Sequence, residues 1–272
     1  MSEQRVLCEI DERDIATITL NRPHKHNAFD DVMIGELIDH LQNLATNLQV
    51  RALIISATGK SFSAGADLAW MQRMAEYDHD ANIADAQQLA KLMRLLDAFN
   101  RPTLALVNGA AFGGAIGLMA CCDSVIAVDS AQFCLSEVRI GLIPAVISPF
   151  VANKLGHSWG RHLMTSAAVF DAQQGLQIGL IHQLVTAEAL ASAGQAWVEQ
   201  TLNNSPQAVA HIKALLRQFD NQTPLAKNNL ADTEAATTKA IADIRVGKAG
   251  QAGLQAFLNK HPAPWQQPKK EQ

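Results

Sequence analysis

The amino-acid sequence predicts an α/β fold whose strands are buried on both faces. Two short apolar runs, at residues 51–57 and 103–107, are each followed by a loop of small residues and then by a helical pattern. Apolar runs without regular alternation are typical of the strands of a largely parallel sheet. A strand–loop–helix order that occurs twice fits such a sheet, since parallel strands are usually connected by a helix.

The N-terminal part is predicted to form a hairpin followed by a helix. Residues 8–10 and 15–20 have the pattern of two strands, joined by a charged turn at residues 11–14 and closed by a turn at residues 21–23. From residue 30 to residue 48 the apolar positions recur at helical spacing, with acidic residues at the start.

The first strand–loop–helix unit covers residues 51–99. Its strand, residues 51–57, is followed by a loop of small residues from 58 to 65, and a helix is expected from Asp67 onward. Residues 76–84 are polar and irregular, which favours a mobile flap. A second helix is expected from about residue 85 to residue 99.

The second unit repeats this order. The strand at residues 103–107 leads into a Gly- and Ala-rich loop at 108–113 and a helix of small residues at 114–122. Strands are expected at residues 124–128 and 131–134. From about residue 157 onward the chain has mostly helical patterns.

Composition excludes several classes of protein. Hydrophobic residues make up 48% and charged residues 18%, which suits a globular protein with a substantial core. The net charge of -4 argues against a nucleic-acid-binding protein. The four cysteines have the spacing of neither a zinc site nor a disulfide framework. No apolar stretch reaches the roughly 20 residues of a membrane span, and the acidic N-terminus is a poor targeting peptide. We expect a cytoplasmic protein.

Two loops offer backbone N–H groups at strand-to-helix junctions. They are residues 63–67, Ser-Ala-Gly-Ala-Asp, and residues 108–115, Asn-Gly-Ala-Ala-Phe-Gly-Gly-Ala. Neither has the pattern of a dinucleotide-binding or phosphate-binding loop. Each alone is also what a tight turn without a ligand requires. If the two loops converge, however, two N–H donors can stabilise one developing oxyanion.

Glu137 lies in an otherwise apolar stretch that ends at Gly141 and Pro144. A carboxylate in this position is either placed for acid/base chemistry or exposed at an edge, paired with a cation such as Arg139. The residues alone leave both interpretations open.

Several motifs, in consistent order along about 260 residues, resemble the crotonase (enoyl-CoA hydratase/isomerase) superfamily. They are residues 21–28, 64–67, 108–109, 113–114, 122–123, 143–144 and 253–260, together with Phe133, Glu137 and Gly141. The resemblance implies a spiral core of repeated ββα units at residues 1–200 and a C-terminal helical trimerisation region at residues 201–272. It also implies an acyl-CoA substrate, no cofactor or metal, no nucleic-acid or membrane partner, and a homotrimer or dimer of trimers.

The resemblance assigns roles to individual residues. Ala66 and Gly114 would donate the N–H groups of the oxyanion hole, and Glu137 would be the catalytic acid/base. The residues that would bind the substrate and its CoA moiety are Lys25, His26, Ala28, Ala64, Asp67, Leu68 and Gly113, with Phe257 and Lys260 closing the CoA site, often from a neighbouring subunit.

One position departs from the family pattern. Hydratases of this family typically carry a first catalytic glutamate one helical turn after the oxyanion-hole glycine, and that position here is Gly117. No other carboxylate occurs between Asp97 and Asp123. Glu137 would then transfer protons alone, or a residue of the expected flap would help it. The candidate helpers are Glu76, Tyr77, Asp78, His79 and Asp80, each of which could instead be a solvated loop residue.

The finer resemblance favours hydration of a branched or carboxylated enoyl-CoA. Residues 133–149 are similar to bacterial 3-methylglutaconyl-CoA hydratases and carboxygeranoyl-CoA hydratases. Arg139, Lys91 and Arg94 are candidates to pair with a distal carboxylate, or they form surface ion pairs. The alternatives are a Δ3,Δ2-enoyl-CoA isomerase that uses a single glutamate, and a catalytically weak relative that binds acyl-CoA or RNA.

Overall fold

The computed structural model describes residues 4–220 and 230–267. The chain forms two compact units. The first comprises Met1–Phe99 and Thr103–Gln195, and the second comprises Asn100–Pro102 and Ala196–Gln272. The predicted boundary after residue 200 and the boundary after Gln195 both lie within helix α7, Leu190–Leu202.

The larger sheet of the first unit has six strands in the order β1-β2-β3-β5-β7-β10. Only β1 and β2 pair in antiparallel fashion, as the predicted hairpin, and the other neighbours are parallel. The strands are β1 (Val6–Ile10), β2 (Ile15–Leu20), β3 (Ala52–Ala57), β5 (Thr103–Val107), β7 (Ser124–Val128) and β10 (Gln183–Val185).

A smaller sheet of four short strands has the order β4-β6-β8-β9. β4 (Ser61–Ser63), β6 (Ala110–Phe112) and β8 (Gln132–Cys134) are parallel to one another, and β9 (Phe170–Asp171) pairs with β8 in antiparallel fashion. The loops predicted at residues 58–65 and 108–113 therefore each contain a strand. Each of these strands has only three residues, mostly with small side chains, so it shows no long apolar run. Pairing with the neighbouring strands holds it in place.

One ββα unit repeats along the chain and contributes one strand to each sheet, which confirms the predicted pattern. Each of β3, β5 and β7 belongs to the larger sheet and is followed at once by β4, β6 or β8 of the smaller sheet. A helix then follows. The helices and 3-10 turns of this part are η1 (Pro23–Lys25), α1 (Asp31–Thr46), α2 (Leu68–Ala75), α3 (His79–Asp97), α4 (Gly114–Cys121), η2 (Glu137–Ile140), α5 (Ser148–Ser166) and α6 (Ala172–Gln177).

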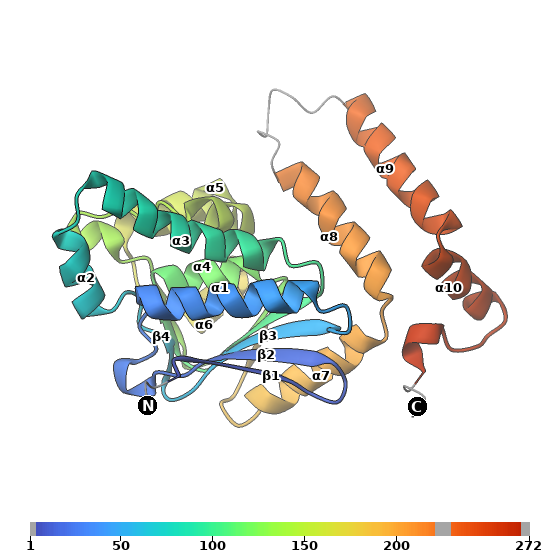
Figure 1. Cartoon of the computed structure of the whole chain (residues 1–272), viewed down its shortest axis with the longest axis horizontal. Coiled ribbons are helices and arrows are strands. Elements are labelled where there is room, and N and C mark those ends of the chain that lie inside the picture. Colours follow the sequence, from blue (N-terminus) through green and yellow to red (C-terminus); the bar gives the residue numbers. More distant parts are fainter. Residues whose placement is uncertain (1–3, 221–229, 268–272) are drawn as a thin grey trace. The chain divides into compact units, whose positions relative to one another are not determined.

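The hydrophobic core lies between the larger sheet and a layer of helices. α1 lies against β1 and β2 and runs beside α3, which contacts α4 (Figure 1). α4 has almost no polar face, since all of its residues except Gly114 and Ala120 are buried. Such a helix belongs inside a fold. Fully buried core side chains from these elements include Ile18, Leu37, Leu41, Leu53, Leu92, Met93, Leu96, Val107, Ile116 and Met119.

The prediction of an irregular flap at residues 76–84 is wrong, because α3 begins within this segment. The side chain of Asp78 accepts a hydrogen bond from the Ala81 N–H (2.8 Å) and caps α3, which begins at His79. A polar first turn with an Asp cap is a common helix start, and its lack of apolar residues hid the helix from the periodicity argument.

The second unit is helical. It contains the last part of α7 with α8 (Pro206–Asp220), α9 (Leu230–Val246), α10 (Lys248–Leu258) and the 3-10 turn η3 (Pro264–Gln266). The Trp265 indole N–H donates to the Asn203 carbonyl (3.1 Å) and ties η3 to the end of α7. Among the described residues, no helix is long and apolar enough to cross a membrane.

Gly109 and Gly35 test the close approach of the connections that lead into β4 and β6. A Cβ at Gly109 would lie 2.1 Å from the Lys60 carbonyl oxygen, whereas a Cβ at Gly35, within α1, meets nothing within 4 Å. We expect Gly109→Ala to lower the free energy of unfolding by about 1–3 kcal/mol. Gly35→Ala should leave it unchanged or raise it by up to about 1 kcal/mol, because alanine favours the helix. Urea unfolding measures both, and equal stabilities would contradict this account of the packing.

Candidate active site

Three parallel strand ends define the candidate site. In the smaller sheet β4, β6 and β8 run in the same direction, with Ser61 and Ser63 opposite Ala110 and Ala111, and with Ala111 and Phe112 opposite Phe133 and Cys134. Their carboxyl ends therefore lie at one edge. The residues that follow directly are the 64–67 loop, the Gly113–Gly114 pair, and Glu137 three positions after β8. The sheet thus brings together all three predicted catalytic residues.

The 64–67 loop is held by Phe29, which pairs with Ala66 as an isolated parallel bridge. The Phe29 N–H donates to the Gly65 carbonyl and the Asp67 N–H donates to the Phe29 carbonyl, each at 2.7 Å. In this pattern the N–H of Ala66 points away from Phe29 and has no hydrogen-bond partner among the described residues. Ala66 is exposed, so its N–H is available to a ligand.

The second donor lies at the start of α4. Gly113 has φ 55° and ψ -123°, a conformation that side chains rarely allow, and its N–H donates to the Cys134 carbonyl (2.9 Å). Gly114 is the first helical residue, so its N–H has no intrahelical acceptor, and no other acceptor occurs in the described part of the chain. A Cβ on Gly113 would lie 4.0 Å from the Gly65 Cα. The two donor loops are therefore in contact.

Glu137 is the carboxylate of this site. Its Oε1 would lie 3.1 Å from a Cβ built on Gly113, so it stands directly beside the second donor loop. Its Oε2 is buried and has no hydrogen-bond partner within the described ranges. Burial raises the pKa of Glu137 above its ordinary value. Burial favours the protonated form of this carboxyl group, which suits a group that must both take up and give back a proton.

Gly117 has no room for a side chain. A Cβ there would lie 2.3 Å from the Ile147 Cγ2, 2.9 Å from the Ile147 Cβ and 3.2 Å from the Met93 Cε. Ile147 is 2% exposed and Met93 is fully buried. The departure from the two-glutamate pattern is thus more than the loss of one carboxylate, because apolar atoms fill the space beside the helix.

The remaining predicted residues of the first unit surround the 64–67 loop. The His26 carbonyl accepts from the Ala64 N–H (2.9 Å), and the His26 Nδ1 lies 3.1 Å from the Ser61 Oγ. Lys25 and Leu68 are exposed, Leu68 by 77%. Ala28 is buried and donates its N–H to the Lys25 carbonyl (3.0 Å).

Asp67 is different in character, since its side chain is fully engaged by the protein. Its Oδ1 accepts the N–H groups of Ala69 (2.8 Å) and Trp70 (3.2 Å), and its Oδ2 lies 3.1 Å from the Arg22 Nη1. Asp67 is only 4% exposed, and these contacts hold the chain rather than face solvent. Any contact of this residue with substrate would be through its backbone.

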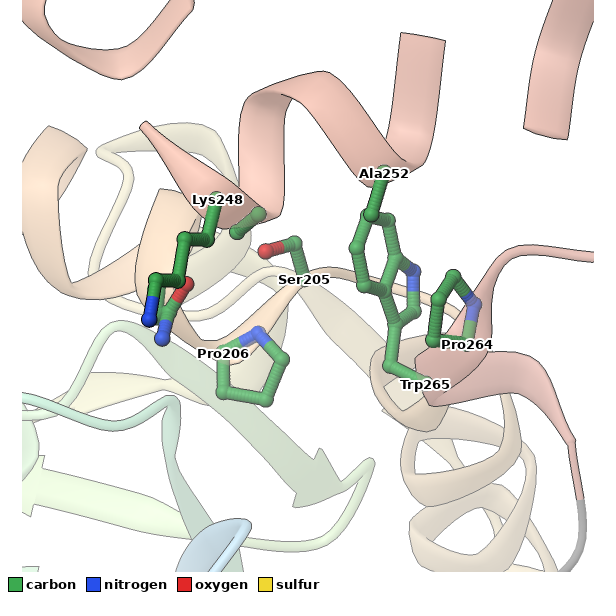
Figure 2. Close-up of a pocket in the computed structure, with 8 residues that line it drawn as sticks. Ser205, Pro206, Lys248, Ala252, Pro264 and Trp265 are labelled. Atoms are coloured by element: carbon green, nitrogen blue, oxygen red, sulfur yellow. The ribbon is translucent and has the colours of Figure 1, made fainter. Parts of the chain in front are cut away.

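Phe257 and Lys260 belong to the second unit. Phe257 is 80% exposed at the end of α10, and Lys260 has a left-handed backbone with φ 56°. The same unit contains a pocket of about 430 Å³ lined by Ser205, Pro206, Lys248, Ala252, Pro264 and Trp265 among others (Figure 2). None of the predicted site residues lines it. The predicted roles of Phe257 and Lys260 stay predictions.

The candidate helpers of Glu137 and the candidate cations for a distal carboxylate are exposed, half-buried or engaged in other contacts. Asp78 caps α3, and His79 and Asp80 are 87% and 98% exposed. The Arg139 Nη2 donates to the Ala167 carbonyl at 2.6 Å. Lys91 and Arg94 lie on α3, half-buried and exposed respectively.

The sequence reasoning missed Arg22, Phe29 and Ile147. Arg22 stands in a turn motif, and Phe29 and Ile147 are apolar residues whose partners are far along the chain. Each has a neighbour from a distant part of the chain, since Arg22 lies beside Asp67, Phe29 pairs with Ala66 and Ile147 adjoins Gly117.

Replacement of Glu137 by glutamine should stabilise the folded chain at neutral pH. Because burial raises the pKa of Glu137 in the folded state, the unfolded chain loses this proton first as the pH rises. The ionised form therefore costs stability above the unfolded pKa of about 4.3. We expect Glu137→Gln to raise the melting temperature at neutral pH, with the difference shrinking toward about pH 4. A difference independent of pH would contradict the assignment.

Gly117→Glu should destabilise the fold, because the added side chain meets Ile147 and Met93 and buries a carboxyl group among apolar atoms. The expected loss is about 2–5 kcal/mol in the free energy of urea unfolding. Ile147→Ala in the same chain should make the combined loss smaller than the sum of the two single losses. Additive losses would show that Ile147 is not the obstacle.

Comparison with known proteins places this geometry in a family. The chain matches the family model described as enoyl-CoA hydratase/isomerase over residues 11–269. An enoyl-CoA hydratase of known structure from Shewanella pealeana is 44% identical, with a TM-score of 0.91 and 96% of both chains covered.

Two further relatives are also named as hydratases. The 2,3-dehydroadipyl-CoA hydratase of Escherichia coli is 29% identical, over 92% of this chain and 94% of that protein. The crotonyl-CoA hydratase of Syntrophomonas wolfei is 32% identical, over 79% of this chain and 82% of that protein. Together with the repeated ββα units and the C-terminal helices, these matches confirm the predicted fold. The chain belongs to the enoyl-CoA hydratase/isomerase family of the crotonase superfamily.

Proposed function

We propose that this enzyme adds water to an enoyl-CoA thioester with Glu137 as its one catalytic carboxylate. Membership of the family establishes an enzyme that acts on CoA thioesters. The observation that carries the finer proposal is the position of Glu137, half-buried with one carboxylate oxygen unpartnered, beside the loops that hold the free N–H groups of Ala66 and Gly114.

The two N–H groups bind the thioester carbonyl oxygen. When water adds to the β-carbon, the electrons of the double bond move to the α-carbon and the carbonyl, and negative charge collects on the oxygen. Donors that are fixed before the reaction stabilise this charge without reorganisation, and removal of one such donor from a protease oxyanion hole costs about 2.7–4 kcal/mol. No metal is required for this step in the proposal.

Glu137 completes the proton balance. As a carboxylate it takes one proton from the attacking water, and as a carboxylic acid it gives a proton to the α-carbon, so that one molecule of water is added overall. The raised pKa of Glu137 assists the second half of this cycle, because the protonated form is easier to maintain. The apolar filling at Gly117 leaves no place there for a second carboxylate.

The alternatives are not favoured by the relatives. An isomerase would need only one carboxylate, as this site provides, but the similar proteins named above are called hydratases. A binding protein without catalysis would have no use for a buried, unpartnered carboxylate oxygen beside two free donors.

We propose a branched or carboxylated acyl group, as in 3-methylglutaconyl-CoA. The support is the resemblance of residues 133–149 and the Escherichia coli relative, whose named substrate has an acyl group that ends in a carboxylate. The candidate cations for a distal carboxylate are Arg139, whose Nη2 donates to the Ala167 carbonyl, and Lys91 and Arg94 on α3.

The CoA moiety would bind along Lys25, His26, Ala28, Ala64, Leu68 and the backbone of Asp67. We further propose that the protein acts in the cytoplasm as a homotrimer or a dimer of trimers, in which Phe257 and Lys260 close the CoA site of a neighbouring subunit. The exposed positions of both residues allow such a contact.

An assay in deuterated water with 3-methylglutaconyl-CoA and a trans-3-enoyl-CoA tests the function. We expect water addition to the first substrate, with one solvent deuteron retained at the α-carbon. Glu137→Gln should lower kcat by about 10²–10⁴-fold, because no other carboxylate replaces it, and should leave thioester binding nearly unchanged.

Conversion of only the trans-3-enoyl-CoA, without gain of water, would establish an isomerase and overturn the proposal. Glu12→Gln provides a matched control, since this residue lies in the β1–β2 turn and outside the site. Full turnover in Glu137→Gln would show that another group carries the protons.

A further inference from the structure

We propose that Arg22 is a positioning residue that fixes the N–H of Ala66 in the oxyanion hole. The inference rests on the proposed function, because it concerns the donor that this function assigns to Ala66. Arg22 does not need to touch the substrate. It acts through two buried carboxylates, Asp67 directly after Ala66 and Asp30 directly after Phe29.

The Arg22 guanidinium stands between Asp30 and Asp67. Its Nη1 lies 3.0 Å from the Asp30 Oδ2 and 3.1 Å from the Asp67 Oδ2, and it donates to the Ala28 carbonyl at 3.3 Å. The side chains are 12%, 7% and 4% exposed for Arg22, Asp30 and Asp67. Arg5 pairs with the same oxygen of Asp30. The cluster thus places two carboxylates and two guanidinium groups largely out of water.

Both carboxylates also begin a helix. The Asp30 Oδ1 accepts from the Met33 N–H (2.9 Å) at the start of α1, while Asp67 caps α2. Burial by itself raises the pKa of Asp67, but the N–H groups of Trp70 and Ala69 and the charges of Arg22 and Lys25 hold it below its ordinary value. A single guanidinium therefore joins the starts of two helices.

Ala66 lies directly before one of these two carboxylates. Asp67 follows it directly and Asp30 follows Phe29, the residue that pairs with Ala66. The bonds from the Phe29 N–H to Gly65 and from the Asp67 N–H to Phe29 set the orientation of the intervening peptide groups. By holding Asp30 and Asp67 together, Arg22 fixes the two strands of this short ladder at the end where these residues follow Phe29 and Ala66.

The same ladder reaches the second donor. A Cβ on Gly114 would lie 3.7 Å from Cδ2 of the Phe29 ring. The backbone of Phe29 holds the first donor loop, and its ring packs against the second. A shift of Phe29 would thus move both N–H groups relative to one carbonyl oxygen.

A buried ion cluster is not in itself a stabilising device, since burial of its charges costs about as much as their attraction returns. Fixed geometry is the effect that it provides, and an oxyanion hole depends on fixed geometry. The role therefore predicts a selective loss of oxyanion binding when the cluster is broken, rather than a uniform loss of affinity.

The experiment compares two ligands in wild type and Arg22→Met. Acetoacetyl-CoA forms an enolate that needs the oxyanion hole, and its absorbance reports the bound enolate. An S-alkyl-CoA thioether has no thioester carbonyl and reports binding of the CoA moiety alone. We expect Arg22→Met to weaken enolate binding and to lower kcat by roughly tenfold or more, less than the 10²–10³-fold cost of removing a whole donor, while thioether affinity changes by less than about twofold.

Three variants accompany this measurement. Arg22→Lys keeps one charged nitrogen, as Nη1 provides to both carboxylates, but loses the planar guanidinium, and it should recover part of the loss. Arg13→Met removes an exposed arginine paired with Asp11 and should change neither ligand. Asp67→Asn retains an oxygen that can cap α2 and loses the ion pair, so it should show the same selective loss even if Arg22→Met does not fold.

The outcomes distinguish failure of the positioning role from failure of the proposed function. Equal weakening of both ligands, or of neither, in folded Arg22→Met and Asp67→Asn overturns the positioning role. Glu137→Gln measured in the same assay tests the proposed function independently. If that variant loses turnover while Arg22→Met keeps it, only the positioning role fails; if Glu137→Gln keeps full turnover, the proposed function fails.

Discussion

The parallel pairing of β4, β6 and β8 is the constraint on which the site depends. These strands are only three residues long, yet their common direction places the donor loops and Glu137 at one edge of a sheet. Each strand follows directly from a strand of the larger sheet, so the hydrophobic core fixes its position. The catalytic geometry is thus built by long-range packing, and the local sequence supplies the small residues that let the loops approach each other.

The electrostatics of the site follow from this arrangement. Two N–H groups without hydrogen-bond partners in the described part of the chain stand near a half-buried carboxylate whose pKa is raised by burial. Both features cost stability in the free protein, and both are suited to a reaction in which negative charge appears on an oxygen and a proton changes place. The buried pairs of Arg22 with Asp30 and Asp67 supply the rigidity, while Ile147 and Met93 keep the region beside Gly117 apolar.

Much of this architecture was predictable from the sequence. The buried strands at residues 51–57 and 103–107, the small-residue loops and the helical pattern at 30–48 correspond to β3, β5, the donor loops and α1. Three kinds of feature were not. β4 and β6 lack an apolar run, the first turn of α3 lacks apolar residues, and the partners of Arg22, Phe29 and Ile147 are distant in sequence. Local pattern carries no information on such contacts, because tertiary pairing alone creates them.

The most direct test of the account is a crystal structure of Glu137→Gln with a bound enoyl-CoA. The account predicts that the thioester carbonyl oxygen lies about 2.7–3.1 Å from both the Ala66 and the Gly114 nitrogen atoms, with the residue 137 side chain facing the α-carbon. A thioester bound with its carbonyl directed away from either nitrogen would contradict the two-donor site.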